Sequence, residues 1–78
     1  MDFREFFKNK LRDLRKERGE TQKQVADDLG ITSRHYQKFE AGEILPSLEN
    51  FIALAGHFNV SLDYLAGRTE ERGPICGN

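Results

Sequence analysis

The sequence lacks several features that mark particular classes of protein. It holds one cysteine, Cys76, so no intramolecular disulfide can form and no cysteine cluster can hold zinc. No apolar run approaches the roughly 18 residues that a membrane-spanning helix needs, and no signal-peptide pattern precedes the domain. These absences argue against a disulfide scaffold and a membrane span, and they fit a reducing, cytoplasmic compartment.

Arrangements of residues that carry out chemistry are also missing. No nucleophile has a base at a recognisable spacing, no glycine-rich phosphate loop is present, and the carboxylates are scattered. His35 and His57 are far apart in the sequence and have no matching ligands nearby. His35 could lie beside a phosphate, and His57 is expected on the surface of its helix. We therefore expect no enzymatic activity, no metal site and no cofactor.

The 78 residues suffice for one domain, and 37% apolar content supports a globular core. The net charge of −1 is unevenly distributed. Residues 1–18 hold seven Lys and Arg against four Asp and Glu, whereas residues 43–78 hold two against five. This distribution fits a nucleic-acid-binding face if the positive groups gather on one side, but it fits two solvated helical faces equally well.

Helical spacing and capping residues divide the chain into five helices. Apolar residues at helical spacing predict a first helix over residues 2–18 that ends before Gly19. Thr21 and Gln24 form a capping box for a second helix over 22–29, and Thr32 caps a third that extends to Glu40. The expected core of the first helix is Phe3, Phe7, Leu11 and Leu14, with Phe6 at its edge.

The rest of the chain continues this pattern. Ser47 and Ser61 are expected to cap a fourth helix and a short fifth helix over 62–66. The apolar face predicted for the fourth helix consists of Leu48, Phe51, Ile52, Ala55 and Phe58. No alternating strand pattern occurs, so the fold is predicted to be all-α. We expect residues 1–67 to form the domain and residues 68–78 a flexible tail that includes Cys76, a thiol without a function.

The stretch from Gln22 to Ala41 has the pattern of a helix-turn-helix. Gly30 separates two short amphipathic helices, and such a unit lets its second helix enter a DNA groove. Its apolar positions are predicted to face the core: Val25, Ala26, Leu29, Ile31, Tyr36 and Phe39.

Several motifs occur in register from about Phe7 to Gly67: F-x-x-x-L-x-x-L-R, T-Q-x-x-x-A, L-G-I-T, F-E-A-G, P-S-L-E and V-S-L-D-Y-L. Together they resemble the DNA-binding domain of the Cro/cI-type (XRE) helix-turn-helix family of bacterial and phage transcriptional regulators. The resemblance implies a compact five-helix bundle of the lambda-repressor-like type, with the helix-turn-helix at helices 2 and 3.

The resemblance also implies roles for individual residues. It assigns base contacts to Ser33, Arg34 and Lys38, with Gln37 a weaker candidate, and an ion pair to Arg15 and Glu40. It assigns a phosphate contact to Gln22, and we include the neighbouring Thr21 and Lys23. Four of these residues have a structural alternative: a solvated charged face for Arg34 and Lys38, a supporting role at the cap for Ser33, and an ordinary first-turn residue for Gln22. For Arg15, the alternative to the ion pair is a phosphate contact.

Two departures from the family pattern stand out. The loop after the third helix, which is often basic in this family, is Glu43-Ile44-Leu45, and Glu20 replaces a residue that is usually apolar. Ile44 and Leu45, with Tyr64 and Leu65 of the fifth helix, form the expected dimer surface. Alternatively, Leu65 belongs to the core and the loop pair covers the fourth helix.

The sequence thus predicts a sequence-specific regulator that binds double-stranded DNA through a recognition helix over about Ser33–Glu40. We expect a homodimer on a near-palindromic site with recognition helices about 34 Å apart. It would act in the cytoplasm, associated with the nucleoid. The alternative is a protein-interaction or antitoxin-like module whose main partner is another protein.

Overall fold

The computed structural model describes residues 2–73, and five helices account for the regular structure within that range. They are α1 (Phe3–Glu17), α2 (Gln22–Leu29), α3 (Ser33–Glu40), α4 (Leu48–Phe58) and α5 (Leu62–Leu65). No strand occurs between residues 2 and 73. The all-α prediction is therefore confirmed.

Each helix begins after a residue whose side-chain oxygen accepts a backbone N–H of the first turn. These residues are Asp2, Thr21, Thr32, Ser47 and Ser61. At Thr21 the capping box is complete, because the Gln24 side chain also accepts the Thr21 N–H at 2.8 Å. The predicted caps of α2 to α5 are thus confirmed. Helix α1 is shorter than predicted by one residue at each end, since Asp2 and Arg18 are its caps, and α5 ends at Leu65 rather than Ala66.

The turn between α2 and α3 depends on Gly30. Its φ of 74° lies in the left-handed region, which a residue with a side chain rarely adopts. This conformation directs the Ile31 N–H back to the Ala26 carbonyl at 3.0 Å and reverses the chain. The reversal places α3 against α2 and closes the helix-turn-helix.

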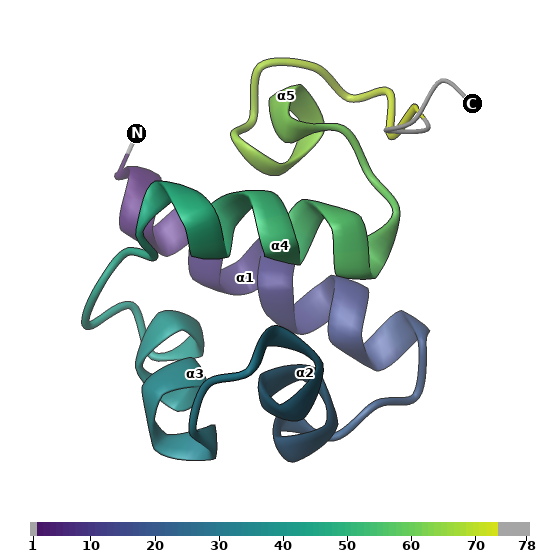
Figure 1. Ribbon diagram of the computed structural model, residues 1–78. Coiled ribbons are helices and arrows are strands. Elements are labelled where there is room, and N and C mark those ends of the chain that lie inside the picture. The colour runs from purple at the N-terminus through teal and green to yellow at the C-terminus, as the bar shows by residue number, and fades with distance from the viewer. Residues whose placement is uncertain (1, 74–78) are drawn as a thin grey trace.

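The helices lie in three levels (Figure 1). Helices α1 and α4 form the middle, α2 and α3 lie on one side of them, and α5 lies on the other side. The buried apolar core is shared by all five helices and the α4–α5 turn: Phe7, Leu11, Leu14, Val25, Ala26, Tyr36, Phe39, Leu54, Ala55, Phe58, Val60, Tyr64 and Leu65. Leu29, Ile31 and Phe3 pack against it while partly exposed, so the predicted inward faces of α1, α2 and α3 are confirmed.

The predicted inward face of α4 is wrong at two positions. Leu48 and Ile52 are 72% and 50% exposed, whereas Leu54 is fully buried. Phe51, Leu54, Ala55 and Phe58 follow i, i+3, i+4, i+7 spacing and pack into the core, which turns residues 48 and 52 outward.

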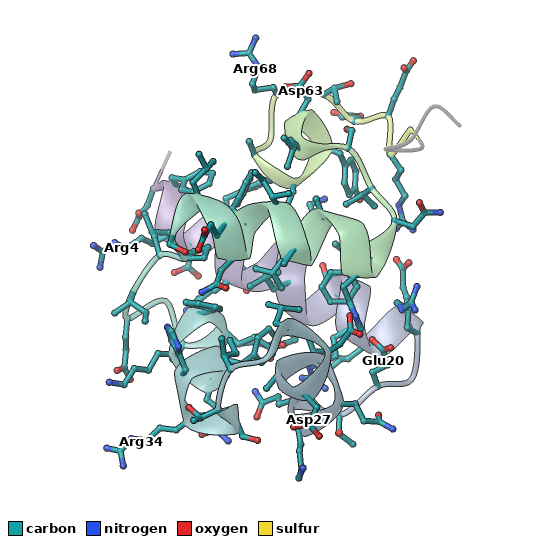
Figure 2. The ribbon with its side chains drawn as sticks, in the orientation of Figure 1. Arg4, Glu20, Asp27, Arg34, Asp63 and Arg68 are labelled. Carbon is teal, nitrogen blue, oxygen red and sulfur yellow. The ribbon has the colours of Figure 1, made fainter. Side chains whose placement is uncertain are left out.

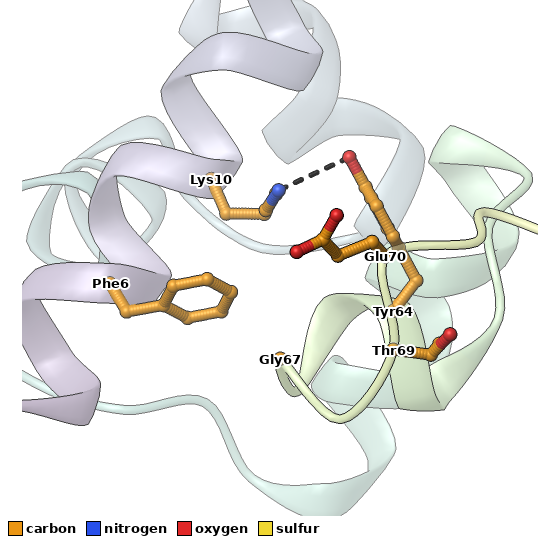
Figure 3. A pocket seen from close by; sticks show the side chains of 6 residues that line it. All are labelled: Phe6, Lys10, Tyr64, Gly67, Thr69 and Glu70. Carbon is orange, nitrogen blue, oxygen red and sulfur yellow. Dashed lines mark hydrogen bonds between the residues drawn. The ribbon is translucent and has the colours of Figure 1, made fainter. Parts of the chain in front are cut away.

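Beyond Gly67, the described part of the segment expected as a tail folds back along α1 and α5. The Arg72 carbonyl accepts the Ser61 N–H at 2.8 Å, and the Arg72 guanidinium donates two hydrogen bonds to the Glu17 carboxylate at 2.7 and 2.9 Å. The fold-back borders an open hollow of about 440 Å³ (Figure 3), which is lined by Phe6, Lys10, Tyr64, Gly67, Thr69 and Glu70. Cys76 lies outside the described residues.

Candidate nucleic-acid interface

The outward face of α3 carries the side chains predicted to read bases. Arg34 and Gln37 are exposed, while Ser33 and Lys38 are half-buried. Arg34 extends away from the body of the protein at the free end of the helix-turn-helix (Figure 2). Arg34, Gln37 and Lys38 border a shallow hollow of about 260 Å³ together with Ala41 and Glu43. Three of the four residues predicted to contact bases, Arg34, Gln37 and Lys38, therefore border one accessible hollow.

Beneath this face, α3 is anchored through the carboxylate of Glu40, which is only 3% exposed. The Arg15 guanidinium donates to both of its oxygens, with Nε–Oε2 at 2.7 Å and Nη2–Oε1 at 3.1 Å. The Tyr36 hydroxyl donates to Oε2 at 2.6 Å, and the Gln22 amide donates to Oε1 at 3.1 Å. The structure therefore brings together Arg15 and Glu40 as the resemblance implied. This cluster connects α1, α2 and α3.

The hydrogen bonds decide the ionisation of this cluster. Burial alone would raise the pKa of Glu40, but the hydrogen bonds from Arg15, Tyr36 and Gln22 outweigh it and lower that pKa below its ordinary value. Burial and the hydrogen bond to Glu40 raise the pKa of Tyr36, so its hydroxyl stays a donor. The hydrogen bond to Glu40 raises the pKa of Arg15. Glu40 is thus a buried carboxylate whose charge is compensated.

The three residues predicted to contact phosphate lie at the start of α2, and each has an intramolecular partner. Gln22 donates to Glu40, the Thr21 hydroxyl accepts from the Gln24 N–H, and Lys23 forms an exposed ion pair with Asp27 at 2.9 Å. Sequence reasoning missed Gln22 and Tyr36 as members of the Glu40 cluster. The sequence does place Tyr36 four residues before Glu40, a spacing at which two side chains are neighbours on a helix.

The prediction that His57 is a surface residue is wrong. Its side chain is 8% exposed, with Nδ1 2.6 Å from an Asp28 carboxylate oxygen and Nε2 2.7 Å from a Glu20 carboxylate oxygen. The three residues connect α4, α2 and the α1–α2 turn. Glu20, which replaces an apolar residue of the family pattern, therefore has a structural partner, and its backbone carbonyl accepts a further hydrogen bond from Arg15 at 3.0 Å.

The expected dimer surface needs correction. Tyr64 and Leu65 are 7% and 0% exposed because they pack into the core, so their side chains are not available to contact a second copy of the protein. Ile44 is half-buried against the core, and Leu45 is 42% exposed. The most exposed large apolar side chains of residues 2–73 include Leu48 and Ile52, one turn apart on α4.

Between residues 2 and 73, no group of three or more His, Cys, Asp or Glu could hold a metal ion. No described helix combines the length and apolar character of a membrane span.

The His35 ring packs beside Phe39, with ring centroids 5.0 Å apart. The arrangement on α3 offers hydrogen-bond donors and positive charge to a polyanion.

Comparisons with known proteins agree with this geometry. A helix-turn-helix family model matches residues 11–65. The chain is 43% identical over 61 residues to the cryptic phage CTXphi transcriptional repressor RstR of Vibrio cholerae serotype O1, covering 78% of this chain and 54% of that protein. It is 37% identical over 65 residues to the uncharacterized HTH-type transcriptional regulator YobD of Bacillus subtilis, covering 83% and 58%.

The HTH-type transcriptional regulator ImmR of Bacillus subtilis is 33% identical over 61 residues, covering 78% of this chain and 48% of that protein. The chain thus spans about half the length of the curated relatives it matches. No solved structure gave a significant match.

Proposed function

The chain belongs to the Cro/cI-type (XRE) helix-turn-helix family of transcriptional regulators, and on this premise we propose that it is a sequence-specific DNA-binding regulator and not an enzyme. Helix α3 enters the major groove as the recognition helix. Arg34 and Lys38 are its principal base-reading side chains, with Ser33 and Gln37 beside them, and Arg can pair with the O6 and N7 atoms of guanine.

The observation that supports this proposal most is the combination of an exposed outer face and a fixed inner face on α3. Arg34 and Gln37 are exposed, while Tyr36, Phe39 and Glu40 are buried. A recognition helix needs this arrangement because its base-reading side chains must be presented in one orientation. The Glu40 cluster supplies that orientation.

We further propose that two copies bind a near-palindromic site. One helix makes few base contacts, and each good bidentate pair gives roughly 1–3 kcal/mol of discrimination, so a single domain selects sites poorly. Because Tyr64 and Leu65 are buried, we place the apolar contact of the dimer at the exposed side chains Leu45, Leu48 and Ile52 instead. The whole protein would act in the cytoplasm on the nucleoid.

The proposal is tested by a gel shift against a pool of genomic fragments. Arg34→Ala combined with Lys38→Ala should abolish the selection of particular fragments without lowering the melting temperature, because neither side chain is buried. The matched control is Lys10→Ala with Arg68→Ala, which removes the same charge on the α5 side of the molecule. Selectivity retained in the α3 double variant would refute the assignment of α3 as the reading helix.

A second candidate function, a module that binds another protein, is favoured by the exposure of Leu48 and Ile52. The salt dependence of binding distinguishes the two candidate functions. DNA binding should weaken steeply as salt rises because counterions are released on binding, whereas an apolar contact between proteins should show little such dependence.

A further inference from the structure

The acidic residue that follows α3, Glu43, borders the same hollow as the base-reading side chains of that helix. The hollow measures about 260 Å³, and Arg34, Gln37 and Lys38 supply its other polar side chains. Glu43 is exposed, so its side chain belongs to the surface that α3 presents. A surface that served only to attract the DNA backbone would not contain a carboxylate, because phosphates repel it. The presence of Glu43 therefore indicates a contact of another kind.

The backbone of Glu43 is fixed at both of its polar groups. Its N–H donates to the Lys38 carbonyl at 3.0 Å, and its carbonyl accepts a hydrogen bond from Arg4 Nη1 at 3.1 Å. Gly42, with a φ of 76°, has the left-handed conformation that lets the chain leave α3 in this direction. Helix α1 and the end of α3 thus hold Glu43 in one position beside the recognition helix.

The carboxylate of Glu43 is free, in contrast to its backbone. Between residues 2 and 73, the ion pairs of Arg and Lys side chains engage other carboxylates and none engages Glu43. This holds for Arg34 and Lys38 as well, although both border the same hollow. An ionised carboxylate accepts hydrogen bonds and donates none, so a molecule that binds here must supply a donor.

The major groove offers such donors only on its bases. Phosphate oxygens are acceptors, whereas cytosine presents its N4 amino group, the group with which Glu pairs. We propose that Glu43 is a specificity-determining residue that accepts a hydrogen bond from the N4 amino group of a cytosine, beside the bases that Arg34 and Lys38 contact. This inference rests on the proposed function and adds a base contact from outside α3.

The proposed contact accounts for an acidic residue in a loop that is often basic in the family. Repulsion between Glu43 and phosphate weakens binding to all DNA. The contact with cytosine restores affinity only at the correct site. Both effects widen the difference in affinity between the correct site and other DNA, which is the quantity that defines specificity.

The test compares the base preferences of wild type, Glu43→Gln and Glu43→Ala by in vitro selection, followed by anisotropy competition with single-base variants of the half-site. Wild type should prefer cytosine at one position, where another base lowers affinity about 5- to 150-fold. Both variants should lose this preference and keep the others. Glu43→Gln should favour adenine there, because a glutamine amide pairs with adenine N6 and N7. Neither variant should lower the melting temperature, since the side chain is exposed and unpaired.

The matched control is Glu70→Gln, which removes the same charge at an exposed position on the α5 side of the molecule and should keep the wild-type preferences. Unchanged preferences in both Glu43 variants overturn the cytosine contact, whether or not their affinity for all DNA rises as repulsion is relieved. That result leaves the proposed function intact, because wild type still selects a site. Wild type that enriches no site refutes the proposed function and this inference together.

Discussion

Glu40 is the residue on which the orientation of the recognition helix depends most. Its carboxylate accepts four hydrogen bonds from three side chains on α1, α2 and α3. Breaking a buried pair by removing one partner leaves an uncompensated charge and is strongly destabilising. The resemblance to the family supplied Arg15 and Glu40, but the remaining donors depend on side-chain directions that sequence spacing does not determine.

This residue gives a pH-dependent prediction. The folded pKa of Glu40 lies below the ordinary value of 4.5, so the carboxylate stabilises the fold above that pH. The contribution is lost as the pH falls from 4.5 through the folded pKa. Glu40→Gln should lower the free energy of unfolding at pH 7 by about 3 kcal/mol, and the difference from wild type should shrink in acid.

Urea unfolding followed by circular dichroism from pH 7 to pH 3 measures this difference. The control, Glu71→Gln, changes an exposed carboxylate and should follow the wild-type curve throughout. A Glu40→Gln curve parallel to wild type at all pH values would contradict the account.

At the scale of the helix, the sequence predicted the bounds of α4 but not which of its faces packs into the core. Capping residues and apolar spacing located all five helices to within one residue at each end. The inward face of α4 was less determined because apolar residues occupy several faces of that helix, so spacing alone fits more than one orientation. In the structure, Leu54 is fully buried in the core, and this fixes the orientation of α4. His57 adds contacts from α4 to Glu20 and Asp28.

A pair of leucine substitutions tests this orientation. Leu54→Ala should cost about 2–5 kcal/mol of unfolding free energy because it opens a cavity in the core. Leu48→Ala, the same chemical change on the same helix, should change it by no more than about 0.5 kcal/mol because the side chain is exposed. Thermal or urea unfolding measures both. Equal costs for the two variants would show that α4 packs through a different face.

At the scale of the whole molecule, helix packing gathers basic side chains in a way that the net charge of −1 does not reveal. Arg4 and Arg12 of α1 donate hydrogen bonds to the Glu43 and Glu40 carbonyls, so α1 lies beside the end of α3. Arg34 lies at the opposite end of the molecule from the Asp63 and Arg68 pair (Figure 2). The sequence revealed a basic first segment and an acidic last segment. It could not show that α1 places Arg4 and Arg12 beside the recognition helix, because that follows from how α1 and α3 pack.

In vitro selection of DNA sites from a random pool tests the central claim, that α3 reads DNA sequence, most directly. Wild type should enrich one short half-site, present as inverted copies about 34 Å apart along the DNA. The Arg34→Ala, Lys38→Ala variant, folded to the same melting temperature, should enrich no common sequence. A wild-type pool without an enriched sequence, or the same site returned by both proteins, would contradict the account.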